Sequence, residues 1–237
     1  MKSRSTFALR RADTVQILAL VTQKGGTGKS SLAVSLAVAA TEKGLKACVF
    51  DIDPQGTAVE WRARRAADWP EVESINWSFL SSRLYALQRE GCDLAIIDTP
   101  GANNAAAEAA MRDATLCLIP VRPSVADIEA AKPTVRYLND REKPFAFVLN
   151  QCPVGGRTAR TSNAYRALQF LSAVSDATIA NRADHLDALA TGLGVTEHAP
   201  SGKAADEVRA LLSWLLVHLS RIERGGRGEA SARQISG

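Results

Sequence analysis

The stretch that decides the fold is residues 23–31, which read QKGGTGKSS. A short apolar run at 15–22 precedes it, and an Ala/Leu/Val-rich run without a helix breaker follows at 28–42. Glycines let backbone N–H groups curl around phosphate oxygens, and the start of a helix adds partial positive charge. A glycine-rich loop between a buried strand and a helix therefore predicts a phosphate-binding loop.

Two side chains of this loop have specific expected roles. Lys29 is expected to reach the β- and γ-phosphates of a nucleotide, and the Ser30 hydroxyl is expected to ligate Mg²⁺. A chance Lys-Ser pair beside a glycine turn would lack the flanking strand and helix. The residues expected to surround the nucleotide here are Lys24, Gly25, Gly26, Thr27, Gly28, Lys29, Ser30 and Ser31.

The rest of the chain alternates short apolar runs with helical patterns. Strand-like runs occur at 46–50, 93–98, 115–121 and 145–150, and 75–80 is a weaker strand candidate. Such alternation predicts parallel βαβ units. We therefore expect an α/β fold, a mostly parallel twisted sheet with helices on both faces.

No shift in composition marks an internal linker, so residues 14–224 are predicted to form one domain. Residues 1–13 are polar and are expected to be a flexible segment. Helices are expected at 161–173 and 206–222. The Gly/Ser/Arg-rich residues 225–237 are expected to be disordered.

Composition sets broad limits on the class of protein. The chain has 237 residues, 46% of them hydrophobic and 23% charged, with a formal net charge of +4. The excess basic residues lie near both ends, where solvated tails and phosphate contacts are both open interpretations. Its four cysteines form no CxxC pair, and no signal peptide opens the chain. We therefore expect a cytoplasmic protein in a reducing compartment.

The loop departs from the standard phosphate-binding pattern at its start. Residue 23 is Gln rather than Gly, and an additional lysine, Lys24, stands before two glycines. The sequence K-G-G-T-G-K-S at 24–30 resembles the deviant Walker A motif of the ParA/MinD family of P-loop ATPases. The resemblance implies ATP and Mg²⁺ as cofactors and a homodimer that forms on ATP binding. It also implies that Lys24 crosses the dimer interface to the partner's nucleotide, as an arginine finger does.

Two acidic segments follow apolar strands. Residues 51–55, DIDPQ, resemble the D-x-D-P-Q segment of the same family, which implies that Asp53 orients the attacking water and Asp51 supports the Mg²⁺ shell. Without the phosphate-binding loop, an Asp-Pro turn with a capping role would be the simpler interpretation. Asp98 ends the run LAIID and resembles a Walker B carboxylate that holds Mg²⁺ through a water.

The predicted catalytic residues are thus Lys24, Lys29 and Asp53, and the predicted metal-binding residues are Ser30, Asp51 and Asp98. Asn150 ends another apolar strand, and the resemblance implies contact with adenine. The alternative for this residue is a strand-end turn former. The chain lacks the N-K-x-D guanine signature, which favours ATP over GTP.

The resemblance extends from about residue 15 to residue 219, and is greatest to the short plasmid-partition members. It implies an ATP dimer that binds nonspecific DNA, drives plasmid or chromosome partition, and is activated by a ParB-like partner protein. Each candidate arginine is equally open to being a solvated helix-face charge. The DNA-binding candidates are Arg157, Arg160, Arg166, Arg182, Arg209, Arg221 and Arg224.

Other classes of function remain as alternatives. The same switch serves equally to position a protein cargo through an adaptor, and a small-molecule ATP-dependent ligase is a more distant alternative. No membrane partner is expected, because the tail after Ile222 lacks the apolar face of an amphipathic anchor. We expect slow basal hydrolysis, a cytoplasmic protein, and association with the nucleoid in the ATP state.

Overall fold

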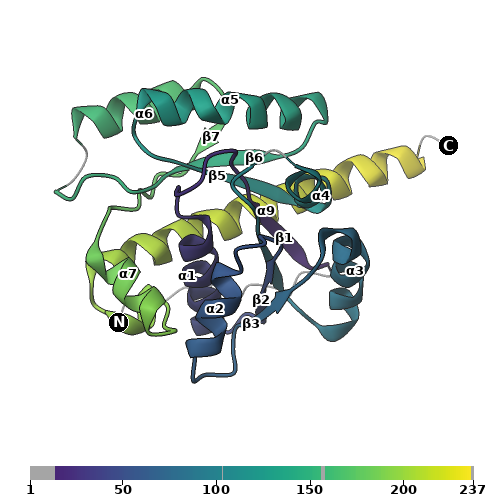
Figure 1. Ribbon diagram of the computed structural model, residues 1–237. Coiled ribbons are helices and arrows are strands. Elements are labelled where there is room, and N and C mark those ends of the chain that lie inside the picture. The colour runs from purple at the N-terminus through teal and green to yellow at the C-terminus, as the bar shows by residue number, and fades with distance from the viewer. Residues whose placement is uncertain (1–13, 103, 156–157, 236–237) are drawn as a thin grey trace, which may run out of the picture.

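The computed structural model describes residues 14–102, 104–155 and 158–235, with side chains described as far as residue 225. The predicted flexible segment, residues 1–13, lies outside this part of the chain. The described residues form a twisted sheet covered by helices on both faces, as the sequence predicts (Figure 1).

The sheet contains seven strands, and every neighbouring pair runs parallel. Their order across the sheet is β3-β2-β4-β1-β5-β6-β7, which places β1 between β4 and β5. The strands are β1 (Gln16–Leu20), β2 (Ala47–Asp51), β3 (Glu71–Ser74), β4 (Leu94–Asp98), β5 (Leu116–Val121), β6 (Phe145–Leu149) and β7 (Ala173–Val174).

Helices connect the strands and form the outer layers of the domain. One face carries α3–α6 and the other carries α1, α2 and α7–α9 (Figure 1). The helices are α1 (Lys29–Glu42), α2 (Thr57–Arg64), the 3-10 turn η1 (Trp77–Phe79), α3 (Leu80–Glu90), α4 (Ala105–Asp113), α5 (Val125–Asp140), α6 (Ala159–Gln169), α7 (Ala183–Ala190), α8 (Val195–His198) and α9 (Lys203–Ile235).

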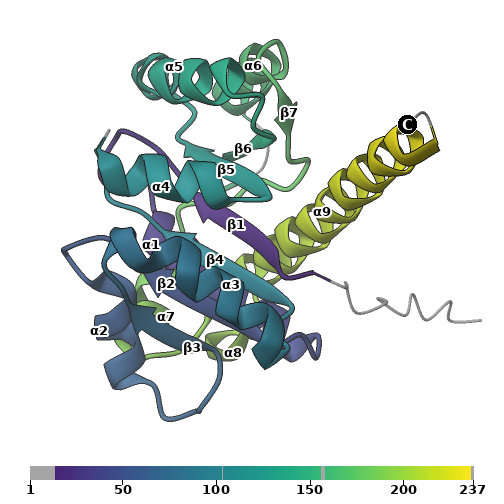
Figure 2. The same cartoon turned by 90° about the vertical axis from the view of Figure 1, so that its right-hand side faces the viewer.

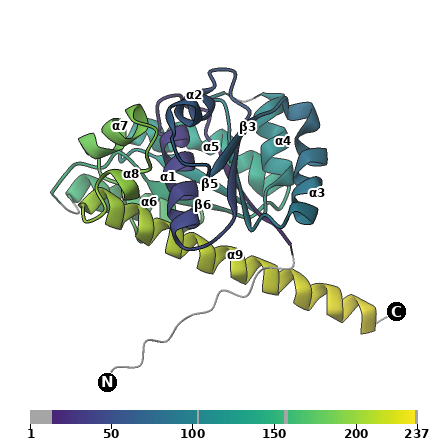
Figure 3. The ribbon, with the colours of Figure 1, turned by 90° about the horizontal axis from the view of Figure 1, so that it is seen from below.

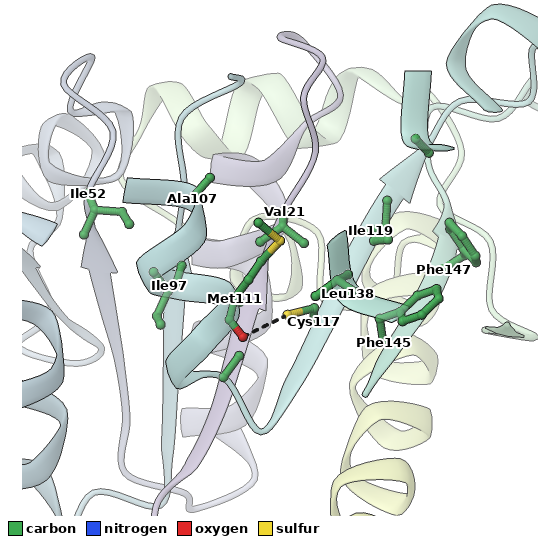
Figure 4. Close-up of a cluster of buried hydrophobic side chains, with 14 of the residues drawn as sticks. Val21, Ile52, Ile97, Ala107, Met111, Cys117, Ile119, Leu138, Phe145 and Phe147 are labelled. Atoms are coloured by element: carbon green, nitrogen blue, oxygen red, sulfur yellow. Dashed lines mark hydrogen bonds between the residues drawn. The ribbon is translucent and has the colours of Figure 1, made fainter. Parts of the chain in front are cut away.

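The inner strands are buried on both faces, which explains their continuous apolar sequences. Side chains alternate between two core clusters, so Leu18 and Leu20 pack toward α1 and α9 while Ala19 and Val21 pack toward α3 and α4. Figure 4 shows part of the second group, where Cys117 and Met111 meet. Both clusters hold the strands in one register, and that register fixes where each strand ends.

Helix α1 is buried nearly all the way round. Every residue from Leu32 to Ala40 is buried, because the sheet covers one side of the helix and α2, α8 and α9 cover the others. Small side chains (Ala and Val) allow this close approach from several directions. The helix that begins at the phosphate-binding loop is therefore fixed rigidly in the domain.

The weaker strand predicted at 75–80 is wrong. The edge strand β3 instead covers Glu71–Ser74, and residues 77–79 form η1. The Asn76 side chain accepts a hydrogen bond from the Ser78 backbone N–H (3.0 Å), so it caps a helical turn. An edge strand pairs with a neighbour on one side only. A short strand of four residues that includes charged side chains can therefore form at the edge of the sheet.

Two further segments differ from the sequence predictions. The helix expected at 161–173 ends at Gln169, and the last residues turn into the edge strand β7 beside β6. The tail expected to be disordered continues α9 through Ile235 (Figures 2 and 3). Propagating an existing helix is easier than starting one, and the Ala, Arg, Glu and Gln residues after 225 favour it despite the glycines.

None of the described helices combines the length and the apolar character that crossing a lipid bilayer requires. The last turns of α9 extend beyond the rest of the domain (Figure 2). This helix lies alongside α1 on the same face of the sheet (Figure 3).

We predict that Leu36→Ala lowers the free energy of unfolding by about 2–5 kcal/mol, because it removes a fully buried side chain of α1 and leaves a cavity. Leu186→Ala on α7 is the matched control, since Leu186 is 70% exposed and its loss should cost about 0.5 kcal/mol or less. Urea unfolding curves of both variants measure the difference. Equal losses for the two variants would contradict the burial of α1.

Candidate phosphate-binding site

The carboxyl ends of β1, β2, β4 and β6 bring most of the predicted site residues to one edge of the sheet. Asp51 and Asp98 are register partners on β2 and β4, and Leu20, the last residue of β1, is the partner of Asp98 on its other side. Ligands of parallel sheets bind at this edge, where the strand order reverses. Here the reversal falls at β1, directly before residues 23–31.

The glycine loop approaches its neighbours too closely for larger residues. Gly26 and Gly28 have φ angles of 71° and 85°, which L-residues with a Cβ rarely adopt. A Cβ on Gly28 would also lie 2.5 Å from Nδ2 of Asn150. Gly28 is the N-cap of α1, so the backbone N–H groups of the loop and the first helical turn are left for an anion.

Two amides after β6 hold the loop in place. Asn150 Nδ2 donates to the carbonyl of Thr27 (2.6 Å), and Gln151 Nε2 donates to the carbonyl of Gly26 (2.9 Å). Asn150 is buried, and Gln151 adopts a φ of 52°. The structure thus gives Asn150 a role in shaping the loop; the predicted contact with adenine stays a prediction. Nothing in the sequence pointed to Gln151.

Lys29 is a buried cation between acidic groups. Its side chain is almost fully covered, and burial lowers the pKa of its ammonium group, while the charges of Asp98 and Asp53 oppose that change. The predicted contact of Lys29 with the β- and γ-phosphates stays a prediction.

Asp98 is a fully buried carboxylate, and in the described part of the chain neither of its oxygens accepts a well-aligned hydrogen bond, although the Ser30 hydroxyl lies near it. Burial raises the pKa of Asp98 to about 7, against the opposing effects of the neighbouring Ser30 hydroxyl and Lys29 ammonium. Unpaired buried charge is costly, and a cation relieves that cost. The residues Asp98 and Ser30 therefore fit a hard cation such as Mg²⁺.

The described residues contain no cluster of three or more His, Cys, Asp or Glu side chains arranged for a metal ion. A cation beside Asp98 would therefore take much of its coordination from hydroxyl, water and phosphate oxygens. This agrees with the usual habit of Mg²⁺ at nucleotide sites, where the protein supplies only one or two ligands.

Asp51 organises the loop between β2 and α2. Its carboxylate accepts hydrogen bonds from the backbone N–H groups of Asp53 (3.1 Å), Ala58 (2.9 Å) and Val59 (3.2 Å). Burial raises the pKa of Asp51, and these three bonds oppose the rise. The predicted support of a Mg²⁺ shell is untested, whereas the capping of α2 is observed.

Asp53 lies in the loop between β2 and α2 and is half-buried. Its carboxylate accepts from the Gln55 backbone N–H (3.0 Å), which fixes the turn that Pro54 begins. The predicted water-orienting role requires Asp53 to face the phosphates. Its charge opposes the lowering of the pKa of Lys29 by burial, and the predicted role of orienting the attacking water stays a prediction.

Lys24 is held by a carboxylate of its own chain. Its Nζ lies 3.1 Å from Oδ1 of Asp127 on α5, and Arg122 Nε lies 2.9 Å from the same oxygen. The Ser124 hydroxyl donates to the other carboxylate oxygen of Asp127. Although burial alone would raise it, hydrogen bonds from Ser124, Arg122 and Lys24 hold the pKa of Asp127 below its ordinary value.

The segment after Asp98 touches the loop through backbone atoms. A Cβ on Gly101 would lie 2.9 Å from the Cα of Gly25, so only glycine fits this position without displacement. The Thr99 hydroxyl donates to the carbonyl of Leu20 (2.7 Å) and holds the segment against β1. The glycine loop and the chain that follows β4 are therefore in close contact.

The DNA-binding candidates fall into separate groups. Arg182 pairs with Glu207 (2.7 Å), and Arg209 donates to the carbonyl of Pro200 (2.6 Å) and lies 3.7 Å from Glu42. Both guanidinium groups are thus used within the chain. The candidates with exposed side chains are Arg160, Arg166, Arg221 and Arg224; Arg157 lies outside the described residues.

Comparisons with known proteins agree with this geometry. A sequence profile of the CobQ/CobB/MinD/ParA nucleotide binding domain matches residues 18–195. The chain belongs to this family. It is 28% identical to protein VirC1 of Rhizobium radiobacter over 68% of this chain and 74% of that protein.

The chain is also 28% identical to the maintenance of carboxysome distribution protein A of Halothiobacillus neapolitanus, over 83% of this chain and 94% of that protein. The fold is similar to that of the septum site-determining protein MinD of Pyrococcus horikoshii, solved with Mg-ADP. That comparison gives a TM-score of 0.67 at 17% identity and covers 84% of this chain and 95% of MinD.

We predict that Asp98→Asn stabilises the nucleotide-free protein at high pH. The folded-state pKa of Asp98 is raised to about 7 from an ordinary 3.8, so its folded form binds the proton more tightly than the unfolded form. Stability from this group is present at low pH and lost as pH rises through about 7. The side-chain amide of the Asp98→Asn variant does not titrate, so this loss of stability is absent from the variant.

Thermal unfolding at about pH 5 and about pH 8.5 measures the effect, and the gain in Tm should be larger at the higher pH. Asp140→Asn, at an exposed carboxylate on α5, is the matched control and should show no such pH dependence. A gain from Asp98→Asn that is the same at both pH values would contradict the buried, unpaired state of this carboxylate.

Proposed function

We propose that this chain is an ATP-dependent switch ATPase that dimerises on binding MgATP, binds nonspecific DNA, and drives partition of a plasmid or chromosome. The observation that carries the proposal is the placement of Lys24. This lysine lies on the glycine loop, at the same edge as Lys29 and the unpaired Asp98, and its ammonium group is bound by a carboxylate outside that loop.

Nucleotide binding is assigned to the loop and the two buried charges. Lys29 and the backbone N–H groups at the start of α1 bind the β- and γ-phosphates, and Ser30 with Asp98 holds Mg²⁺. When bound, the cation neutralises charge that develops on the transferred phosphoryl group. Asp53 orients the attacking water, and Asp51 fixes the loop that carries it.

Dimerisation is assigned to an exchange of partners by Lys24. In the single chain, its ammonium group pairs with Asp127 and keeps 34% of its side-chain surface exposed. Asp127 is 6% exposed and keeps Arg122 and Ser124 as partners when Lys24 leaves, so the carboxylate is not left alone. The γ-phosphate of a nucleotide bound to a second copy offers Lys24 a more strongly charged acceptor.

DNA binding is assigned to the exposed arginines of α6 and α9. Phosphate contacts need only placed cations, so they give affinity without sequence readout and weaken with salt. We base this assignment on Arg160, Arg166, Arg221 and Arg224, because their side chains are exposed, whereas Arg182 and Arg209 form ion pairs with carboxylates of the chain. The protein is then cytoplasmic, and associated with the nucleoid while it holds ATP.

Slow basal hydrolysis is part of the proposal, because the ATP state must last long enough to act as a signal. A ParB-like partner protein stimulates hydrolysis and returns the chain to single subunits. Lys24, Lys29 and Asp53 are the residues that act on the reacting phosphate.

The test measures binding to a nonspecific DNA duplex with ATP, with ADP, and with ATP and Lys24→Ala. We expect binding only for the unaltered protein with ATP, because the mutant cannot close the dimer. Raising the salt concentration from about 50 to about 200 mM should weaken that binding by at least about tenfold, as counterion release requires for even a few phosphate contacts. Fluorescence anisotropy of labelled DNA gives the affinities.

Arg89→Ala is the matched control for a loss of positive charge, since Arg89 is an exposed cation on α3, a helix that carries none of the proposed arginines. It should bind DNA like the unaltered protein. An ATP dimer that ignores DNA at all salt concentrations would contradict the DNA-binding part of the proposal.

Positioning of a protein cargo is the second candidate, favoured by the similarity to a carboxysome distribution protein over most of both chains. A gene for a centromere-binding protein next to the gene for this chain would support partition. A neighbouring gene for an adaptor of a protein assembly would support positioning. The family also includes the CobQ and CobB type, so ATP-dependent turnover of a small carboxylate substrate would instead support a ligase.

A further inference from the structure

A buried arginine follows the helix that succeeds the Asp53 loop. Arg65 comes directly after α2, and its side chain is only 3% exposed. Its guanidinium donates to both carboxylate oxygens of Glu197 (2.8 and 2.7 Å), to the carbonyl of Gly192 (3.0 Å) and to the carbonyl of Trp69 (2.8 Å). A guanidinium group that binds a carboxylate through two N–H groups, and carbonyl oxygens through others, makes some of the strongest polar contacts available to a side chain.

Arg65 belongs to a connected set of residues that includes partners of its own partners. We call this set the α2 clamp: Trp61, Arg65, Gly192, Leu193, Gly194 and Glu197. Glu197 also accepts from the Gly194 backbone N–H (2.9 Å). The ring of Trp61 lies 5.1 Å from the Arg65 guanidinium, and its Nε1 donates to the carbonyl of Leu193 (3.0 Å). The clamp therefore joins α2 to the turn between α7 and α8.

Two glycines allow this turn to fit between two helices. A Cβ on Gly192 would lie 2.6 Å from the backbone of Arg64 and Arg65. A Cβ on Gly194 would lie 2.6 Å from the side chain of Val38, which belongs to α1. The clamp thus fixes α2 against the same helix that begins at the phosphate-binding loop.

Helix α2 is anchored at both of its ends. Asp51 binds its first N–H groups, and the clamp binds its last turn. The helix has only eight residues, so a movement at its end is transmitted to its start. Asp53 lies four residues before this start, and along the chain it falls between Asp51 and the clamp.

We propose that Arg65 is a positioning residue for ATP hydrolysis, which holds the Asp53 loop at a fixed place relative to the loop that binds the phosphates. The inference rests on the proposed ATPase function and extends it to a residue remote from the reacting atoms. Small displacements of a group that orients a reactant lower the rate by one to two orders of magnitude. Nucleotide affinity depends mainly on the glycine loop and α1, which do not contain Arg65.

The test compares Arg65→Lys, Arg65→Met and Glu197→Gln with the unaltered protein. Single-turnover hydrolysis of ATP is measured per nucleotide-binding site, and ATP affinity is measured separately by fluorescence titration. We expect hydrolysis to fall by about tenfold or more and the affinity to change by less than about threefold. Arg65→Lys should not rescue the rate, because an ammonium group cannot reproduce the two parallel contacts of the guanidinium with Glu197.

Arg64→Met is the matched control, since Arg64 is the neighbouring residue at the end of α2 and donates one long hydrogen bond, 3.5 Å, at the exposed surface. Its rate should equal that of the unaltered protein. The double variant Arg65→Met with Glu197→Gln should hydrolyse ATP no more slowly than the slower single variant, because both changes break one contact.

Rates per binding site within about twofold of the unaltered value in the Arg65 and Glu197 variants would overturn the inference, and would leave the clamp a stabilising contact only. If one variant fails to fold, the others decide the question, because Glu197→Gln keeps the shape of the site. Absence of hydrolysis in the unaltered protein would refute the proposed ATPase function itself.

Discussion

Parallel pairing of β2 and β4 places the carboxylates of Asp51 and Asp98 side by side at one edge of the sheet, with Lys29 buried beside them. Such a cluster is costly to bury unless each charge has a partner. Asp51 has its partners in the backbone of the next loop, whereas the oxygens of Asp98 have no well-aligned hydrogen bond in the described part of the chain and only Ser30 and Lys29 nearby. The fold thus leaves one negative charge that a bound cation would stabilise.

The rest of the site follows from how close backbone segments come to that edge. Gly28 leaves room for Asn150, and Gly101 leaves room for Gly25, so the loop, β6 and the chain after β4 are in direct contact. Such contacts have little freedom to adjust independently, because interiors are close-packed. A ligand bound by the loop would therefore affect the segments after β4 and β6 together, as a nucleotide switch requires.

Much of this arrangement could be predicted from the sequence, because strong local signals carried it. Long apolar runs predicted the inner strands, and the glycine-rich loop with Lys29 and Ser30 predicted the phosphate site. The edge strands β3 and β7 could not be predicted reliably, since each pairs on one side and needs few apolar residues. The extension of α9 depends on propagation from an already formed helix, which composition alone does not show.

Contacts between distant residues were the main part that sequence reasoning missed. Asp127 as the partner of Lys24, and Glu197 as the partner of Arg65, join segments that only the tertiary fold brings together. A charged residue on a helix usually indicates a solvated face, so the burial of Arg65 has no local sequence signal.

The central claim is that a nucleotide bound at this loop closes a dimer through Lys24. Sedimentation of the unaltered protein and of Lys24→Ala, each with ATP, with ADP and without nucleotide, tests it most directly. The account predicts twice the monomer mass only for the unaltered protein with ATP, while Lys24→Ala still binds ATP as a monomer. A mass that does not depend on nucleotide, or a dimer that forms equally well without Lys24, would contradict it.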